Sequence, residues 1–343
     1  PESAVTRATR IDPQQEALLR VDGLKVHFDM RTAGWFGATR SLRAVDGVDL
    51  MLQPGETLGV VGESGCGKST LARAILQLVP ATAGRVCLLG QDLDDLDREA
   101  LRATRSELQV IFQDPLASLN PRMTVGDIVS EPLWTHRPEL DTVGVRALVV
   151  EVLERVGISG RELNRYPHEF SGGQCQRIGI ARALVLKPKL IICDEPVSAL
   201  DVSIQAQIVN LLMDLQADFG LALIFIAHDL AVVRHISHRV MVMYLGTIME
   251  VASRQDLYDR PGHPYTRALI SAVPIPDPDK ERSRERELLA GDLPSPLDPP
   301  SGCRFRTRCR FAEDRCSREV PDLRSLGQSW VACHRAEELS PSS

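Results

Sequence analysis

The sequence predicts an α/β fold in which short apolar strands alternate with helices. Residues 62–70 match the phosphate-loop pattern G-x-x-x-x-G-K-[ST], between an apolar strand at 57–61 and a helical stretch at 71–76. Residues 190–193 and 222–227 are apolar throughout, which is typical of buried parallel strands. Polar side chains follow the ends of several strands, where α/β sheets place their ligands. These observations predict a nucleotide-binding α/β core.

The loop at 62–70 carries the first functional prediction. Its glycines let consecutive backbone N–H groups turn inward at a helix N-terminus, which suits a polyphosphate. We expect Lys68 to reach the β- and γ-phosphates and the Ser69 hydroxyl to coordinate Mg²⁺. The candidate nucleotide-binding residues of the loop are Gly62, Ser64, Gly65, Cys66, Gly67, Lys68, Ser69 and Thr70. The alternative, a chance Gly-rich turn, does not account for the strand and helix on either side.

Length and composition describe a chain with a sizeable core. The 343 residues include 43% hydrophobic and 25% charged side chains, as in soluble globular proteins. A net charge of -6 argues against nucleic acid as the main partner. No apolar run reaches membrane-spanning length, and residues 1–10 lack the apolar core of a signal peptide, so we expect a cytoplasmic protein. Its eight cysteines are then poor candidates for structural disulfides.

The segment before the loop predicts two strands. Residues 18–28 alternate in polarity, residues 29–42 resemble a loop, and residues 42–51 form the second strand. Phe28 is the candidate for stacking on a purine, although a core-packed strand residue fits equally well. Trp35 and Phe36 are weaker candidates within the expected loop.

The middle of the chain predicts a helical insertion. A strand at 84–90 and a helical stretch at 92–107 precede an apolar strand at 108–112, which ends at Gln113. Such a glutamine can bind Mg²⁺ or position water, and an ordinary loop residue is the alternative. Residues 116–170 contain helical patterns such as 143–156, separated by prolines, which indicates an insertion into the α/β core.

Three further groups carry possible chemistry. Ser171, Gly172, Gly173 and Gln174 precede a helix at 175–186, which gives a second helix N-terminus that attracts phosphate or a simple Gly-rich cap. The strand at 189–193 ends in Asp194 and Glu195, which suit one metal ligand and one group that polarises water. A helix at 202–219 and the strand at 222–227 follow, and His228 comes next. Strands at 239–244 and 246–252 close the core.

These motifs, in this order, resemble the ATPase subunits of ATP-binding-cassette (ABC) transporters. Residues 170–184 and 193–207 and the segment Pro261 to Leu269 are most similar to the oligopeptide and dipeptide importers, in particular to their second ATPase subunit. The signature has Phe170 where the family usually has leucine. The resemblance covers residues 18–335 and implies a P-loop NTPase (RecA-like) core with an antiparallel β subdomain, a helical insertion and a small cysteine-containing C-terminal extension.

The resemblance also implies residue roles and partners. It makes Glu195 the general base, His228 a clamp on the γ-phosphate and water, and Gln113 and Asp194 ligands of Mg²⁺ together with Ser69. Residues 171–174 and Asp201 would contact ATP held by a partner ATPase, which is most often a different chain. Two transmembrane permeases and an extracytoplasmic solute-binding protein would complete a peptide importer, with this chain peripheral on the cytoplasmic face of the membrane.

The expected organisation has three parts. Residues 1–17 form an N-terminal tail, residues 18–260 the ABC ATPase domain with its helical subdomain at about 116–183, and residues 261–343 the C-terminal extension. The alternative functions are the same role for nickel or another small solute, and a non-transport ABC ATPase acting in DNA repair or ribosome recycling. The acidic balance and the single cassette argue against the latter.

Four cysteines in the extension predict a metal site. Cys303, Cys309, Cys316 and Cys333 follow the pattern C-x5-C-x6-C-x16-C among several arginines. Clustered thiols in a cytosolic protein are better metal ligands than disulfide partners. Their gaps exceed the usual zinc spacing and are compatible with a [4Fe–4S] cluster, which similar tails of peptide-importer ATPases are associated with. Zn²⁺ and unligated thiols are the alternatives.

Overall fold

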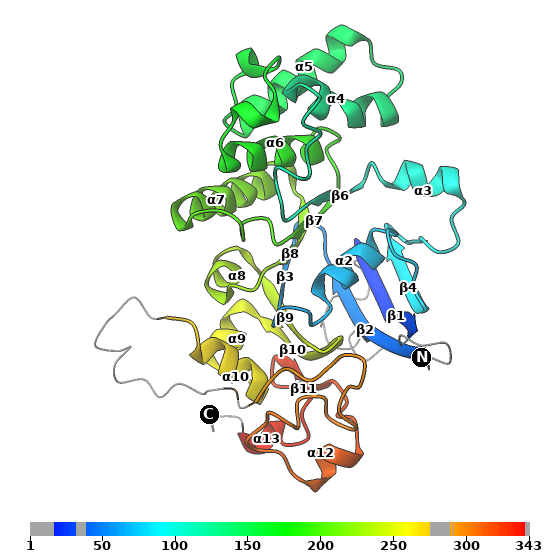
Figure 1. The fold of residues 1–343 in the computed structure, drawn as a ribbon, viewed down its shortest axis with the longest axis vertical. Helices are drawn as coiled ribbons and strands as arrows, with labels where there is room; N and C mark the ends of the chain where they lie inside the picture. The colour runs from blue at the N-terminus through cyan, green and yellow to red at the C-terminus, as the bar shows by residue number, and fades with distance from the viewer. Residues whose placement is uncertain (1–16, 32–38, 275–288, 290, 340–343) are drawn as a thin grey trace. The chain divides into compact units, whose positions relative to one another are not determined.

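The computed structural model describes residues 17–31, 39–274, 289 and 291–339. Its elements are labelled in Figure 1, and they fall into two compact units. The first unit comprises Pro1–Gln53, Leu58–Asp94 and His228–Ser343, and the second comprises Pro54–Thr57 and Asp95–Ala227. Each unit is described by itself. Trp35 and Phe36 lie outside the described residues.

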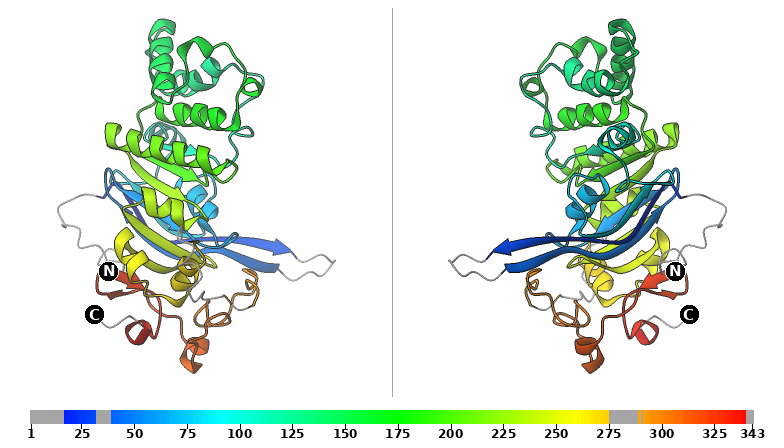
Figure 2. Two further views of the ribbon diagram at one scale, coloured as in Figure 1. Left: turned by 90° about the vertical axis from the view of Figure 1, so that its left-hand side faces the viewer. Right: turned by 90° about the vertical axis from the view of Figure 1, so that its right-hand side faces the viewer.

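An antiparallel sheet of the first unit has the strand order β2-β1-β4-β5. Its strands are β1 (Leu19–Arg31), β2 (Thr39–Leu52), β4 (Ala83–Leu88) and β5 (Gln91–Asp92). Figure 2 shows β1 and β2 as a long two-stranded ribbon. Alternate β1 side chains, such as Leu19 and Val21 and, beyond a register shift, Leu24 and Val26, are buried because successive residues of a strand face opposite sides.

The hairpin formed by β1 and β2 is longer than the sequence predicts. The expected loop at 29–42 is wrong at both ends, because Asp29 pairs with Ser41 and Arg31 pairs with Thr39. Phe28 and Met30 are exposed in this outer part of the hairpin. Backbone hydrogen bonds sustain the strands here without a buried face, so the hydrophobic pattern carries no signal of their extent.

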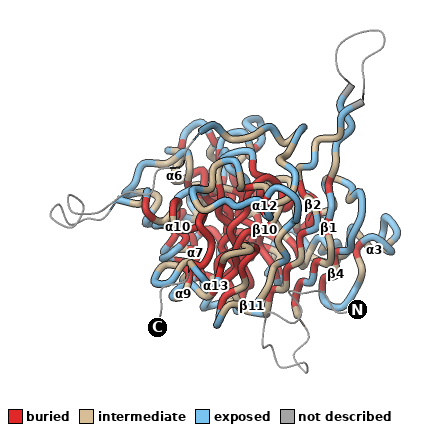
Figure 3. Tube along the Cα trace, turned by 90° about the horizontal axis from the view of Figure 1, so that it is seen from below, coloured by how far each residue is buried: buried red, intermediate tan, exposed pale blue. Residues whose placement is uncertain are grey.

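The other strands of the first unit lie in the order β11-β12-β10-β9-β3. They are β3 (Thr57–Val61), β9 (Arg239–Tyr244), β10 (Thr247–Ser253), β11 (Arg324–Leu326) and β12 (Ser329–Val331). β3 and β9 are parallel, whereas the remaining pairs are antiparallel. β10 belongs to the buried interior in Figure 3. The sequence predicted β9 at these bounds but not β11 and β12, which are too short to show a period.

The helices of the first unit are short. They are α2 (Lys68–Ile75), α8 (Leu230–Ile236), α9 (Arg254–Asp259), α10 (Pro264–Ser271), α12 (Asp314–Arg318) and α13 (Ala336–Leu339). α2 contacts β1 and β2, and α9 and α10 contact β10.

The second unit contains three parallel strands in the order β8-β7-β6. They are β6 (Leu108–Ile111), β7 (Leu190–Asp194) and β8 (Ala222–Ile226). Its helices are α3 (Arg98–Thr104), α4 (Val125–His136), α5 (Thr142–Arg155), α6 (Gly172–Leu184) and α7 (Val202–Phe219), with 3-10 turns η1 (Gly160–Glu162) and η2 (Pro167–Glu169). Helices α4, α5 and α6 contact one another and form the helical insertion (Figure 1). α7 has the predicted bounds.

The helix expected over 92–107 is shorter. Asp92 pairs with Cys87 in the antiparallel sheet, and α3 begins only after Asp97, whose carboxylate accepts a hydrogen bond from the Ala100 N–H. The N-cap therefore sets the start of this helix. The α/β fold with an antiparallel sheet, a helical insertion and a cysteine-containing C-terminal part is otherwise confirmed.

Residues 261–269 join α10 to β10 through a buried carboxylate. Glu250 is fully buried and accepts hydrogen bonds from the N–H groups of Gly262 (2.8 Å) and His263 (2.9 Å). The His263 ring is buried as well, and its Nδ1 accepts a hydrogen bond from the Tyr265 N–H at 3.0 Å. Burial, together with the charge of Arg267, lowers the pKa of His263 to about 3.

The buried His263 predicts a loss of stability in mild acid. In the unfolded chain its pKa is about 6.5, so the unfolded state takes up a proton that the folded state refuses as the pH falls below that value. Between pH 7 and pH 5 this effect lowers the free energy of unfolding by about 2 kcal/mol. Urea unfolding of the wild type and of His263→Asn, whose amide oxygen can still accept from Tyr265, should show this difference.

The quantity to compare is the change in unfolding free energy between pH 7 and pH 5 in the two proteins. Burial raises the pKa of the adjacent Glu250, and this raised pKa makes the folded state more stable as the pH falls, opposite to the effect of His263. An equal pH dependence in both proteins would contradict the assignment.

Candidate functional site

The phosphate loop closes around its own lysine. It connects the end of β3 at Val61 to the start of α2 at Lys68. The Lys68 side chain is only 4% exposed, and its Nζ donates hydrogen bonds to the carbonyl oxygens of Gly62 (2.8 Å) and Glu63 (3.1 Å). A positive charge therefore lies inside the loop, at the N-terminus of a helix, which is an environment that favours an anion.

Two glycines of the loop are sterically required. A Cβ at Gly62, where φ is 152°, would lie 2.2 Å from the carbonyl oxygen of Met243. A Cβ at Gly67, where φ is 107°, would lie 2.1 Å from the carbonyl oxygen of Ala44. Both backbones adopt conformations that side chains disfavour, and both have another main chain packed against them. The loop is thus fitted tightly against neighbouring backbone.

The remaining loop residues differ in accessibility. Ser64 and Gly65 are exposed, whereas Ser69 and Thr70 are half-buried in the first turn of α2. Cys66 is buried, and burial raises the pKa of its thiol although the Lys68 charge opposes this. Cys66 is therefore a neutral packing residue, and its carbonyl accepts a hydrogen bond from the Gly246 N–H at 2.8 Å.

In the second unit, Glu195 follows β7 in a strained conformation. Its φ of 49° is uncommon for a residue with a side chain. Its N–H donates to the Ile226 carbonyl (3.0 Å), and its own carbonyl accepts from the Ser198 hydroxyl (3.0 Å). Strain of this kind costs on the order of 1–3 kcal/mol and is found at functional sites. The preceding residue, Asp194, is buried with 8% exposure.

The structure brings Gln113 and Glu195 together. β6 and β7 are parallel neighbours, so the residues that follow their C-terminal ends meet at one edge. The Gln113 Nε2 donates to the Glu195 Oε2 at 3.1 Å, across 82 residues of sequence. The predicted water-polarising carboxylate and the predicted glutamine are therefore in direct contact.

Residues 171–174 form a capping box at the start of α6. The Gln174 N–H donates to the Ser171 hydroxyl (3.3 Å), and the Gln174 side chain accepts from the Ser171 N–H (2.9 Å). Gly173 lies close to α7, since a Cβ there would approach the Ile204 Cγ2 to 2.6 Å. Asp201 is the N-cap residue of α7, but its carboxylate does not cap that helix. Residues 171–174 therefore cap α6, and this role is compatible with phosphate binding at the same helix N-terminus.

Two predicted residues belong to the first unit. His228 follows the end of β8 and directly precedes Asp229, whose carboxylate caps α8 through the Ala231 N–H at 2.7 Å. Phe28 pairs with Leu42 in the outer hairpin, and it is 39% exposed. The exposed ring leaves the purine-stacking prediction open, whereas a core position is excluded.

The four cysteines of the C-terminal part lie close enough to influence one another. The Cys303 N–H donates to the Cys316 carbonyl at 2.8 Å. Burial, with the charge of the neighbouring thiolates, raises the pKa of Cys303 to about 12 and that of Cys333 to about 11. In the described part of the chain, no three His, Cys, Asp or Glu side chains are arranged to hold a metal ion. The predicted iron–sulfur site is thus not supported by the side-chain geometry of these residues.

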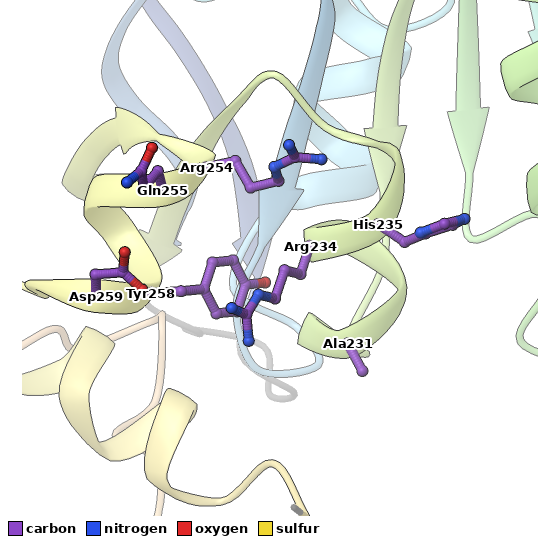
Figure 4. Close-up of a pocket in the computed structure, with 7 residues that line it drawn as sticks. All are labelled: Ala231, Arg234, His235, Arg254, Gln255, Tyr258 and Asp259. Carbon is purple, nitrogen blue, oxygen red and sulfur yellow. The ribbon is translucent and has the colours of Figure 1, made fainter.

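Sequence reasoning missed two contacts to the phosphate loop. The Glu63 N–H donates to the Tyr265 hydroxyl at 3.0 Å, and the Glu63 carboxylate pairs with Arg308. The only signal in the sequence was the group of arginines among the cysteines near residue 308, and this pattern does not indicate which residues the arginines contact. A separate pocket of about 510 Å³ is lined by residues of α8 and α9. Figure 4 shows these residues, among which Arg234 lies over the Tyr258 ring. None of the predicted site residues lines this pocket.

Two family models match the chain. The model described as "ABC transporter" matches residues 45–198, and the one described as "Oligopeptide/dipeptide transporter, C-terminal region" matches residues 249–316. The oligopeptide transport ATP-binding protein OppF of Salmonella typhimurium is 60% identical over 95% of this chain and 98% of its own length. AppF of Bacillus subtilis, also an oligopeptide transport ATP-binding protein, is 51% identical over 93% of this chain and 98% of its own.

Solved structures show the same fold. CbiO1 of Clostridium perfringens, part of the ABC transporter complex cbiONQ, has a TM-score of 0.61 and 26% identity, covering 71% of this chain and 92% of its own. The ATP-binding cassette MJ0796, a dimer bound to ADP and Pi, has a TM-score of 0.61 and 28% identity, covering 69% of this chain and 98% of its own. The predicted P-loop NTPase core is consistent with both.

Proposed function

Because the chain belongs to the ATP-binding subunits of ABC transporters of the oligopeptide and dipeptide importer family, we propose that it hydrolyses ATP to energise the import of oligopeptides. The observation that carries this proposal is the presence of both family matches in one chain, the cassette followed by the oligopeptide-type C-terminal region. The second match favours a peptide cargo over nickel or another solute, and both favour transport over DNA repair or ribosome recycling.

The proposal places the chain at the cytoplasmic face of the membrane as a peripheral subunit. No helix among the described residues is long and apolar enough to cross a membrane. Two transmembrane permeases and a solute-binding protein would complete the importer. The names of the relatives, which are oligopeptide transport ATP-binding proteins, support this assembly.

ATP and Mg²⁺ are the cofactors of this family of ATPases. The donor set fits Mg²⁺, since the Ser69 hydroxyl, the Gln113 amide and the Asp194 carboxylate offer the hard oxygen ligands that it prefers. The Gln113 Nε2 is engaged by Glu195, which leaves the amide oxygen for a cation. The metal ion would neutralise the charge on the phosphate oxygens. Lys68 and the loop amides would bind the β- and γ-phosphates, and Phe28 would stack on the adenine.

Glu195 is assigned the general base. Its strained backbone and its contact with Gln113 fix the carboxylate, and a fixed carboxylate can accept the proton of an attacking water without reorganisation. His228 would orient the same water and the γ-phosphate. Because this chain carries both residues, we infer that its own site is competent for hydrolysis.

A second ATPase subunit, homologous but different, would complete each site. Residues 171–174 at the N-terminus of α6, together with Asp201, would contact ATP that the partner chain holds. The corresponding residues of the partner would contact ATP held by this chain. The dimeric state of the similar cassette MJ0796 supports two such subunits. Closure of the pair around ATP would then drive the permeases, and hydrolysis would reset them.

For the four cysteines we propose a [4Fe–4S] cluster, with Zn²⁺ as the alternative. The support is their number, their mutual proximity and the burial of Cys303 and Cys316. Ligation would require the thiols to deprotonate and to turn toward one another, because the present arrangement does not hold a metal ion. Distance in sequence from the hydrolytic residues indicates a structural or regulatory role.

Replacement of the proposed base predicts a separation of binding from turnover. Glu195→Gln should leave the ATP dissociation constant within about twofold and lower steady-state hydrolysis by roughly 100-fold or more, because a positioned general base contributes about 10²–10⁴-fold. The measurement uses the assembled complex with the other ATPase site already disabled.

Glu154→Gln, at an exposed position of the second unit, is the matched control and should hydrolyse ATP at the wild-type rate. Unchanged hydrolysis in Glu195→Gln would remove Glu195 from the role of base.

Purification without oxygen tests the cysteine proposal. We expect about four iron atoms per chain and a brown visible absorption, both lost in Cys309→Ser and Cys316→Ser. Cys87→Ser, at a cysteine on β4 outside the group, should keep both. Colourless protein with stoichiometric zinc would contradict the [4Fe–4S] cluster and support a Zn²⁺ site. Metal-free protein would contradict both.

A further inference from the structure

Arg304 and Arg308 flank a buried phenylalanine in the cysteine-containing C-terminal part. Residues 303–309 form consecutive turns, in which the Arg308 N–H donates to the Phe305 carbonyl at 3.0 Å. Phe305 is 2% exposed, and its ring packs edge-on against Tyr244, with ring centroids 5.4 Å apart, and at a tilt against Tyr265, with centroids 5.3 Å apart. This aromatic anchor fixes the two arginines relative to β9, α10 and the phosphate loop, all within the first unit.

Arg308 holds the start of the phosphate loop. Its two Nη atoms pair with the two carboxylate oxygens of Glu63, at 2.5 Å and 3.0 Å. The Arg308 side chain is 7% exposed, so water screens this bidentate pair only weakly. The same Glu63 donates its N–H to the Tyr265 hydroxyl and accepts a hydrogen bond from Lys68 at its carbonyl. Glu63 is therefore held by its side chain and by both of its backbone groups.

Arg304 supports the other end of the loop. It donates to the carbonyl of Leu245 and pairs with the carboxylate of Asp46. Burial raises the pKa of Asp46, but Arg304 and His27 outweigh it and hold the pKa below its usual range, so the pair is ionised. The Asp46 N–H donates to the Gly246 carbonyl, and the Gly246 N–H donates to the Cys66 carbonyl, both at 2.8 Å. Arg304 thus fixes the backbone on which the end of the loop rests.

We propose that Arg304 and Arg308 are positioning residues that keep the two ends of the phosphate loop in the shape that binds ATP. The C-terminal part would then set the affinity of the nucleotide site as well as pack against the core. The inference rests on the proposed role of residues 62–70 in ATP binding. A purely structural role would lower stability alone, whereas a positioning role changes ATP affinity in protein that remains folded.

The test is an ATP titration of the full chain carrying Arg308→Met. We expect the dissociation constant to rise roughly tenfold, because a charge-assisted hydrogen-bonded pair is lost at the loop. Arg306→Met is the matched control, since within the described residues the Arg306 side chain bonds to Ser301 and not to the phosphate loop, and it should bind ATP as the wild type does. Arg308→Lys should recover part of the affinity, and Arg304→Met should weaken binding in the same direction.

Glu63→Gln breaks the pair from the loop side and leaves the C-terminal packing in place, so it carries the test if Arg308→Met does not fold. Lys68→Ala is the reference for loss of phosphate binding. Wild-type affinity in Arg308→Met or Glu63→Gln, with binding lost in Lys68→Ala, would overturn the positioning role alone. Wild-type affinity in Lys68→Ala would overturn both this inference and the proposed function of the loop.

Discussion

A lysine ammonium buried inside its own loop is the constraint on which the nucleotide-binding part of this protein depends. A buried charge is costly unless polar groups surround it, and Lys68 obtains these from the carbonyls of Gly62 and Glu63. On either side of this loop the chain takes positive φ values, 152° at Gly62 and 107° at Gly67. The main chains of Met243 and Ala44 then pack where side chains would otherwise stand. The loop shape is therefore determined by residues distant in sequence as well as by its own glycines.

In the second unit, a strained backbone conformation positions the Glu195 carboxylate. Glu195 must leave a buried strand and present a carboxylate, and its backbone takes a left-handed conformation to do so. The Glu195 N–H donates to the Ile226 carbonyl, and the Glu195 carbonyl accepts from the Ser198 hydroxyl, so that both backbone groups are held. Gln113 donates to the Glu195 side chain. The hydrogen bonds to the surrounding sheet offset the strain of the Glu195 backbone, and the carboxylate is thereby preorganised.

Sequence reasoning found the elements whose patterns are local. The phosphate loop, helix 202–219, strand 239–244 and the polar residues at strand ends all follow from short motifs and apolar runs. It did not find the length of the β1–β2 hairpin, because exposed ladders have no hydrophobic signature. It also missed the contact of Arg308 with Glu63, which joins residues 245 positions apart. The geometry of the four thiols likewise depends on packing that spacing alone does not specify.

The coupling between Glu63 and Arg308 tests most directly whether the C-terminal part shapes the phosphate loop. A double-mutant cycle would compare ATP affinity in the wild type, Glu63→Gln, Arg308→Met and the doubly substituted chain. Our account predicts that the double variant binds ATP about as well as either single variant, because both substitutions remove the same interaction. Losses of affinity that simply add, or no loss in any variant, would contradict it.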